Sequence, residues 1–162
     1  MECDCIVNMC VKTKRSLFLM TAIVTLLFTG ESRARDEVQE FPISAPMASS
    51  TAKEKLTSEV KFYFGETEFG LVQQSFGEYR TNKKTNAFGK SDAEACSWVF
   101  LSALIQLHDR AVSMGGNAVI RIRSNYRNSE SSSTATFRCG AGNVIAGVAL
   151  IGEIVILGNR PR

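Results

Sequence analysis

The pattern of apolar positions is clearest between Ser91 and Asn117, where it is typical of one buried helix. Apolar side chains recur there at three- and four-residue spacing, which makes one stripe. It contains Cys96, Phe100, Ala103, Leu107, Ala111 and Met114. A second stripe beside it contains Trp98, Leu101, Ile105 and Val112. Ser91 with Glu94 forms a candidate capping box, and Gly115 and Gly116 follow the last apolar residue. The stretch therefore predicts a long helix that is covered on more than one side.

Alternating apolar and polar residues predict strands before and after this helix. We expect strands at 60–64, 71–79, 118–126, 134–139 and 145–157. A polar basic loop at 80–90 leads into the helix, and a Ser-rich hairpin tip occupies 128–133. The residues of the third strand expected to point toward the helix are Ala118, Ile120, Ile122 and Tyr126. The order strand–strand–helix–strand–strand–strand predicts an α+β fold, a two-layer sandwich in which one long helix packs on one face of a mainly antiparallel sheet.

The N-terminal part of the chain is typical of an export signal. A basic cluster at 12–15 precedes a short apolar run at 16–29, and small residues follow the run. The run is shorter than the roughly 20 residues of a transmembrane helix. We therefore expect residues 1–34 to be a signal peptide that starts at Met1 or Met9 and directs the protein to a bacterial periplasm. The alternative is an uncleaved signal that anchors the protein in the membrane.

Composition places the rest of the chain in one globular domain. The 162 residues are 44% apolar, which is ordinary for a domain of this size. We expect a flexible N-terminal arm at 35–58, because its prolines and small polar residues show no period. The domain is expected at 59–158, followed by a tail at 159–162. Lysine and arginine total 19 against 16 acidic residues, and this near balance argues against nucleic-acid binding.

The cysteines predict one disulfide. Three of the five, Cys3, Cys5 and Cys10, precede the apolar run and would leave with the signal. Cys96 lies on the main apolar stripe of the helix, and Cys139 lies on the helix-facing side of its strand, so the two can meet. An oxidising compartment would bond them. The alternative is two buried free thiols.

The sequence lacks the motifs of a catalytic or cofactor site. Residues 89–91, Gly-Lys-Ser, precede the helix as in a phosphate loop, but Lys84 stands where that motif needs glycine. His108 is the only histidine, and neighbouring helical residues such as Asp109 point in different directions. We expect this histidine to be solvated or partly packed. Zinc-type cysteine spacing and a serine-hydrolase elbow are also missing. We therefore expect no catalytic residue, no metal and no cofactor.

One predicted surface could bind a partner. The outward face of the sheet carries Lys61, Tyr63, Arg121, Arg123, Arg127 and Arg138, and the basic loop adds Arg80, Lys83, Lys84 and Lys90. Arginines on a sheet face can hold carboxylate or phosphate groups. Suitable partners would be lipid headgroups or an acidic envelope protein. The alternative is a solvated face whose arginines pair with Glu153 and other acids across strands.

The segments GGNAVIRIRSNYRN, FRCGAG and GVALIGEIVIL give the chain a family resemblance over roughly residues 57–157. It resembles small exported bacterial proteins related to the soluble domain of the Rcs envelope-stress lipoprotein and, more distantly, YbjQ-like domains. This resemblance implies a small α/β sandwich tied by disulfides between the helix and the sheet. Some similar proteins carry the label of an excinuclease ATPase subunit. That activity needs a phosphate loop and a longer chain, so we do not expect it here.

These observations lead to three functional hypotheses. The first is an exported, non-catalytic binding or envelope-stress sensing module. The second is a periplasmic enzyme with an unrecognised site, and the third is a structural protein of the cell envelope. A pocket with converging polar groups or a defined ligand surface would separate them.

Overall fold

The structure is a computed structural model that describes residues 36–158. Its elements are β1 (Asp36–Pro42), α2 (Ser44–Met47), α3 (Ser50–Lys55), β2 (Lys61–Phe64), β3 (Val72–Asn86), α4 (Asp92–Ser113), β4 (Ala118–Tyr126), β5 (Ser129–Ser131), β6 (Thr136–Gly142) and β7 (Ile145–Leu157). The expected signal peptide at 1–34 and the tail at 159–162 lie outside the described residues. No helix within 36–158 is long and apolar enough to cross a membrane.

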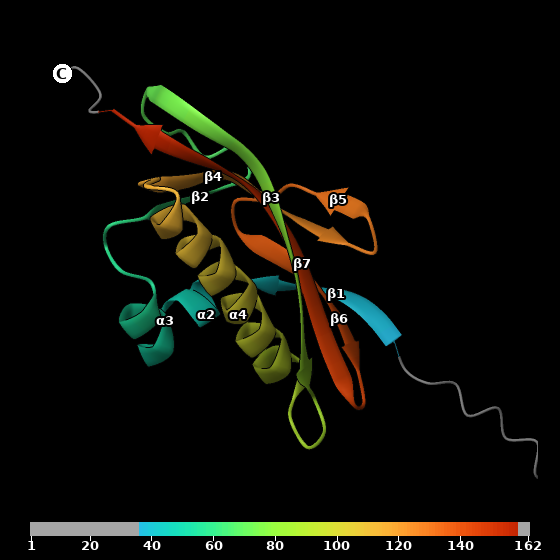
Figure 1. Cartoon of the computed structure of the whole chain (residues 1–162). Helices are drawn as coiled ribbons and strands as arrows, with labels where there is room; N and C mark the ends of the chain where they lie inside the picture. Colours follow the sequence, from blue (N-terminus) through green and yellow to red (C-terminus); the bar gives the residue numbers. More distant parts are fainter. Residues whose placement is uncertain (1–35, 159–162) are drawn as a thin grey trace, which may run out of the picture. The chain divides into compact units, whose positions relative to one another are not determined.

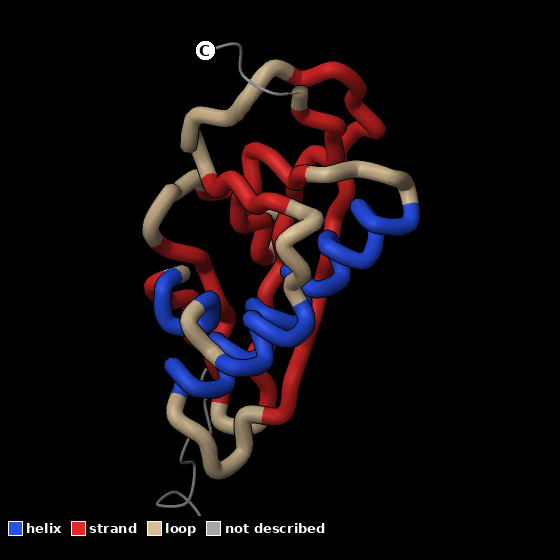
Figure 2. The backbone as a smooth tube through the Cα atoms, turned by 90° about the vertical axis from the view of Figure 1, so that its left-hand side faces the viewer, coloured by secondary structure: helices blue, strands red, loops and turns tan. Residues whose placement is uncertain are grey.

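The α+β fold class is confirmed: one seven-stranded, curled sheet carries the long helix α4 on one face (Figure 1). The strand order is β1-β6-β7-β4-β2, with β3 paired along the other edge of β7 and β5 paired with β4. All strand pairs are antiparallel except β2 with β4, which is parallel. Figure 2, turned toward the helical side, shows the helices in front of the strands. The opposite face of the sheet, which we call the open face, is covered by none of the helices within residues 36–158.

The helix α4 begins and ends where the sequence predicts. The hydroxyl of Ser91 accepts a hydrogen bond from the Glu94 amide at 3.2 Å, and Gly115 adopts a φ of 73° just beyond the last turn. The main apolar stripe is buried except for Met114, which is partly buried, and the Phe100 ring stacks on Phe137 of β6 at 4.1 Å between centroids. The second stripe is covered only in part, because Trp98 remains 53% exposed.

The expectation of a flexible arm at 35–58 is wrong where the structure describes this segment. All seven residues of β1 pair antiparallel with β6. The Phe41 ring lies 6.0 Å from the Phe137 ring, Ile43 is buried, and Ser49 caps α3 through its hydroxyl. The segment folds because the edge of β6 supplies backbone hydrogen bonds, which a pattern of side chains cannot reveal.

The strands after the first also differ from the prediction. The basic loop expected at 80–90 is strand as far as Asn86, which pairs with Ile145 at the start of β7. The tip expected at 128–133 contains the short strand β5. The strand expected at 134–139 is β6, which begins at Thr136 and ends at Gly142. Polar side chains are tolerated in β3 because the open face is solvated and β7 offers an uninterrupted edge for pairing.

The register predicted for the third strand is wrong at its start. Val119 and Ile122 belong to the core beneath α4, whereas Ala118 and Ile120 pack in a separate cluster on the open face. The pairing of β4 with β7 shifts register around Arg121, whose φ is 50°. A bulge of this kind inserts one extra residue and reverses the alternation of side chains.

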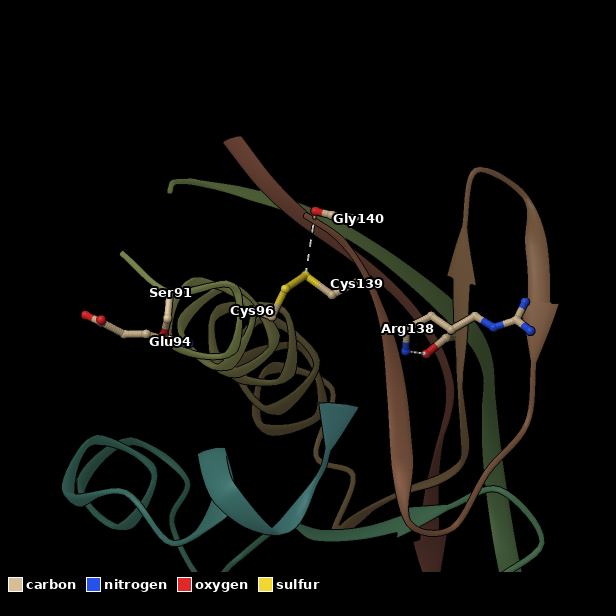
Figure 3. The surroundings of a disulfide bond; sticks show 7 residues. Ser91, Glu94, Cys96, Arg138, Cys139 and Gly140 are labelled. Atoms are coloured by element: carbon tan, nitrogen blue, oxygen red, sulfur yellow. Dashed lines mark hydrogen bonds between the residues drawn. A yellow bond between two sulfur atoms is a disulfide. The ribbon is translucent and has the colours of Figure 1, made fainter. Parts of the chain in front are cut away.

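The predicted disulfide between Cys96 and Cys139 is confirmed. The two residues are bonded, with their Cα atoms 5.9 Å apart, and both are fully buried. The bond joins the first turns of α4 to the middle of β6 (Figure 3). Helix and sheet are therefore linked covalently at the centre of the core.

Candidate functional site

Strand alternation decides which charged residues reach the open face. On β6, Cys139 is turned toward α4 and Arg138 is turned away from it (Figure 3). On β3, the Tyr79 ring lies 5.2 Å from the guanidinium carbon of Arg110 in α4. Its neighbour Arg80 therefore points to the open face, as do Asn82 and Lys84 further along the strand. Lys83 is on the helix side and does not join them.

Three arginines expected to bind anions are already held by carboxylates. Nη1 of Arg121 lies 2.6 Å from Glu153, and Arg138 lies 3.4 Å from Glu40. Arg123 bridges two acidic residues, Glu78 and Glu130, each at 2.8 Å. The hydrogen bond to Glu130 raises the pKa of Arg123 most, while burial acts in the opposite direction and the bond to Glu78 adds to the rise. These arginines thus belong to cross-strand ion pairs, as the alternative expectation described.

A second set of cations lines a hollow on the open face. The hollow has a volume of about 780 Å³ and is bounded by β3, β7, the β4–β5 turn and the β6–β7 turn. We call it the basic hollow. Its cationic residues are Arg80, Lys84 and Arg127; its amide residues are Asn82, Asn125, Asn128 and Asn143. No aspartate or glutamate is among the described residues that line it.

The β4–β5 turn places one wall of the basic hollow. Arg127 and Asn128 have φ values of 54° and 61°, which form a two-residue turn of the type that suits hairpins. The Asn128 amide donates to the Asn125 carbonyl at 3.3 Å. Asparagine tolerates this left-handed conformation better than most residues. The turn thus brings Arg127 to the rim of the hollow.

Tyr126 supports this wall, although its expected position on the helix side is wrong. A Cβ atom added to Gly140 would overlap the Tyr126 hydroxyl, so the ring lies over Gly140 on the open face. The guanidinium carbon of Arg127 lies 5.5 Å from the centre of the same ring, a cation–π contact. Beyond Ser124, β4 is paired only with β5, and two-stranded ribbons twist strongly enough to turn a side chain to the other face.

The other predicted cations lie apart from the basic hollow. The Lys90 ammonium donates to the Asn86 carbonyl at 3.0 Å. Lys61 and Tyr63 line a smaller hollow of about 330 Å³, which also contains Glu59 and Glu68 and is therefore of mixed charge. The structure brings Arg80 and Lys84 together with Arg127 but does not add Lys61, Tyr63, Lys83 or Lys90 to them. Sequence reasoning missed the asparagines, although Asn125 and Asn128 flank the predicted hairpin turn.

His108 is more buried than the sequence suggested. It is 5% exposed, its Nε2 lies 3.0 Å from the Thr57 hydroxyl, and its Nδ1 lies 3.2 Å from the Asp109 carboxylate. The expectation of a solvated or partly packed side chain is wrong, because Thr57 before β2 closes over this part of α4. The expectation that Asp109 points in a different direction is also wrong, because its carboxylate contacts Nδ1 of His108. Within residues 36–158, no group of three or more His, Cys, Asp or Glu side chains could hold a metal ion.

No protein-family model matches the chain, and no curated protein and no solved structure matches it. The function is therefore inferred from the residues described above.

Proposed function

We propose that the protein is an exported, non-catalytic binding module and that the basic hollow takes an anionic ligand. The observation that carries this proposal is the contrast between two sets of cations on the same face. Arg121, Arg123 and Arg138 have carboxylate partners. Arg80 and Lys84 make no ion pair within residues 36–158. An anion at these two residues would displace water, whereas an anion at Arg123 would have to break existing pairs.

The size and rigidity of the basic hollow also favour binding. Ligand sites for small molecules commonly measure about 300–1,000 Å³, and the hollow has about 780 Å³. Its floor is β3 and β7, paired without interruption from Arg80 with Ile151 to Asn86 with Ile145. Cations displayed on such a ladder lose little backbone freedom when a ligand binds, which lowers the entropic cost.

Export and membership of the envelope family remain part of the proposal. The buried disulfide is compatible with an oxidising compartment such as the periplasm. The resemblance to the soluble domain of the Rcs envelope-stress lipoprotein supports the same location and a binding or sensing role without catalysis. An acidic envelope protein and lipid headgroups are the partner classes expected to carry the anionic group.

Titration with pyrophosphate, followed by amide chemical shifts, tests the proposal. We expect shifts confined to 80–84, 125–128 and 142–147. The double variant Arg80→Gln/Lys84→Gln should weaken binding at least about tenfold, since each lost charge–anion hydrogen bond contributes about 1.5–3 kcal/mol. Shifts centred on Arg121 and Arg123 would contradict the proposed site.

The matched control removes the same charge elsewhere. Lys53 and Lys55 are exposed on α3, outside the basic hollow. The double variant Lys53→Gln/Lys55→Gln has the same net charge as the test variant and should bind pyrophosphate like the unmodified protein. An equal loss in both variants would mean that binding follows net charge and not the hollow.

A further inference from the structure

We infer that the ligand of the basic hollow is a small acidic sugar, which carries a carboxylate or phosphate together with several hydroxyl groups. This inference rests on the function proposed above and adds a ligand class to it. Three features of the hollow carry it: a lining of asparagine amides, a floor in which β3 is paired with β7, and an apolar side wall beside the cations.

The amide groups are the first feature. Asn125 is 8% exposed and lines the hollow, so its side chain would lie close to a bound ligand. Hydrogen bonds between a ligand and this amide would replace hydrogen bonds to water in a site of restricted solvent access. Asn82, Asn128 and Asn143 extend the amide lining around the hollow from three further segments.

Asparagine side chains favour a ligand whose groups both donate and accept hydrogen bonds. Each asparagine offers an NH₂ donor and a carbonyl acceptor. A bare phosphate or carboxylate can only accept, so it would leave the carbonyl oxygens without partners. Sugar hydroxyls donate and accept, and adjacent hydroxyls can meet both atoms of one amide. The cations Arg80 and Lys84 would then hold the acidic group of the same molecule.

The floor of the hollow distinguishes a sugar from a peptide. Extended peptides usually bind through backbone hydrogen bonds to a strand edge. Between Arg80 and Asn86, the backbone of β3 on the side of the hollow is paired with β7. Recognition here therefore falls to side chains, which suits a compact molecule with many hydroxyls.

The side wall completes the fit. Val144 and Ile145, which line the hollow next to Lys84, are 60% and 55% exposed. Large exposed apolar side chains beside a polar hollow are suited to the C–H face of a sugar ring. A sugar acid thus has a complement for each of its parts: cations for the acid, amides for the hydroxyls and an aliphatic wall for the ring.

Calorimetric titration with four probes tests the inference. D-glucuronate supplies charge and hydroxyls, glucose supplies hydroxyls alone, acetate supplies charge alone, and pyrophosphate supplies several charges on a compact molecule. We expect glucuronate to bind at least about tenfold more tightly than glucose or acetate, since sites built for hydroxyls discriminate strongly against ligands that lack them. Glucuronate binding no better than acetate would overturn the inference.

Variants of the asparagines test whether these residues cause the preference for glucuronate. Asn125→Ala should reduce glucuronate affinity several-fold and leave pyrophosphate affinity nearly unchanged. Asn82 is exposed, so Asn82→Ala tests the same point without risk to folding. Gln74→Ala, an exposed amide on the same strand that lies outside the hollow, is the control and should bind both probes normally. Asparagine variants that leave the preference for glucuronate intact would also overturn the inference.

The two proposals fail in different ways. If pyrophosphate binds in the hollow but glucuronate gains nothing over acetate, the anion site stands and the sugar class is wrong. If neither anion binds at Arg80 and Lys84, both proposals are wrong. If glucose binds as tightly as glucuronate, the hydroxyl recognition stands and the role assigned to the cations is wrong.

Discussion

Arg123 shows how burial and partners decide what one charged residue contributes. Its side chain is 19% exposed and bridges Glu78 and Glu130, whereas Arg121 is 53% exposed and has one carboxylate partner, Glu153. The raised pKa of Arg123 means that the folded state binds this proton more tightly than the unfolded state. Its contribution to stability is therefore complete at neutral pH and is lost only as strongly alkaline pH passes the raised value.

We expect Arg123→Gln to lower the free energy of unfolding by about 1 kcal/mol or more, because two half-buried carboxylates lose their partner. Arg121→Gln should cost less, since Arg121 is 53% exposed and the variant removes one carboxylate pair and not two. Urea denaturation of both variants measures the difference. Equal losses in the two variants would show that the network around Arg123 adds nothing.

Thr81 presents the opposite case, a buried polar atom without a partner. It is 5% exposed, and its Oγ1 makes no hydrogen bond within residues 36–158. Thr81 is among the residues that line the basic hollow, but its side chain points toward α4, because it lies two positions from Tyr79 and pairs with the core residue Leu150. We expect Thr81→Val to raise the free energy of unfolding by about 1 kcal/mol, since a methyl group replaces an unsatisfied hydroxyl. A lower thermal midpoint would indicate an unseen partner, such as a buried water molecule.

Gly140 controls the position of Tyr126. A Cβ at Gly140 would overlap the Tyr126 ring, so Gly140→Ala must displace the ring or the hairpin that carries it. Overpacking of this kind costs about 1–3 kcal/mol, and we expect pyrophosphate binding to weaken as Arg127 loses its support. When the Tyr126 ring is absent, as in Tyr126→Ala, adding Gly140→Ala should lower the free energy of unfolding much less than it does in the unmodified protein. A strictly additive double-mutant cycle would contradict the contact.

At the scale of elements, the disulfide links the two layers of the fold. It joins α4 to β6 across a loop of 43 residues. In the chain-entropy model such a loop contributes about 4 kcal/mol, by restricting the unfolded chain. Cys96→Ala/Cys139→Ala should therefore lower the thermal midpoint by many degrees in the same buffer. If the reduced unmodified protein melts like the oxidised protein, the bond does not stabilise the fold.

The elements of the fold differ in how well the local pattern of apolar and polar residues predicts them. The helix α4 has its own cap and its own apolar stripe, and β7 is a long run that is apolar apart from Glu153, so both were predicted closely. β1 and the second half of β3 are polar segments that pair with an available edge. Their side chains carry little periodicity, because the hydrogen bonds that hold them come from the backbone of a distant strand.

At the scale of the whole molecule, the charges are nearly balanced but unevenly placed. The formal net charge is +3, yet acidic residues pair with arginines along the sheet and none lines the basic hollow within 36–158. Local charge, and not net charge, should therefore govern the attraction of an anion.

We expect pyrophosphate affinity to fall steeply with salt. The Debye length shortens from about 30 Å at 0.01 M to about 8 Å at 0.15 M ionic strength. The hollow is open to solvent, so its cations are screened by added salt. Calorimetric titrations across this range measure the slope, and Arg80→Gln/Lys84→Gln should flatten it. An affinity independent of salt would mean that the ligand is held by uncharged contacts.

The sequence by itself determined the fold class, the helix α4 with both ends, the long strand β7 and the pairing of Cys96 with Cys139. These features follow from local periodicity and capping, which the order of residues contains. Only the tertiary structure decided which cations are available to a ligand. The sequence predicts anion binding by Arg123 and by Arg80 alike. Long-range strand pairing places Glu78 and Glu130 beside Arg123, whereas Arg80 faces a hollow that no acidic residue within 36–158 lines. Such neighbours are set by register and twist across the sheet, which no local pattern specifies.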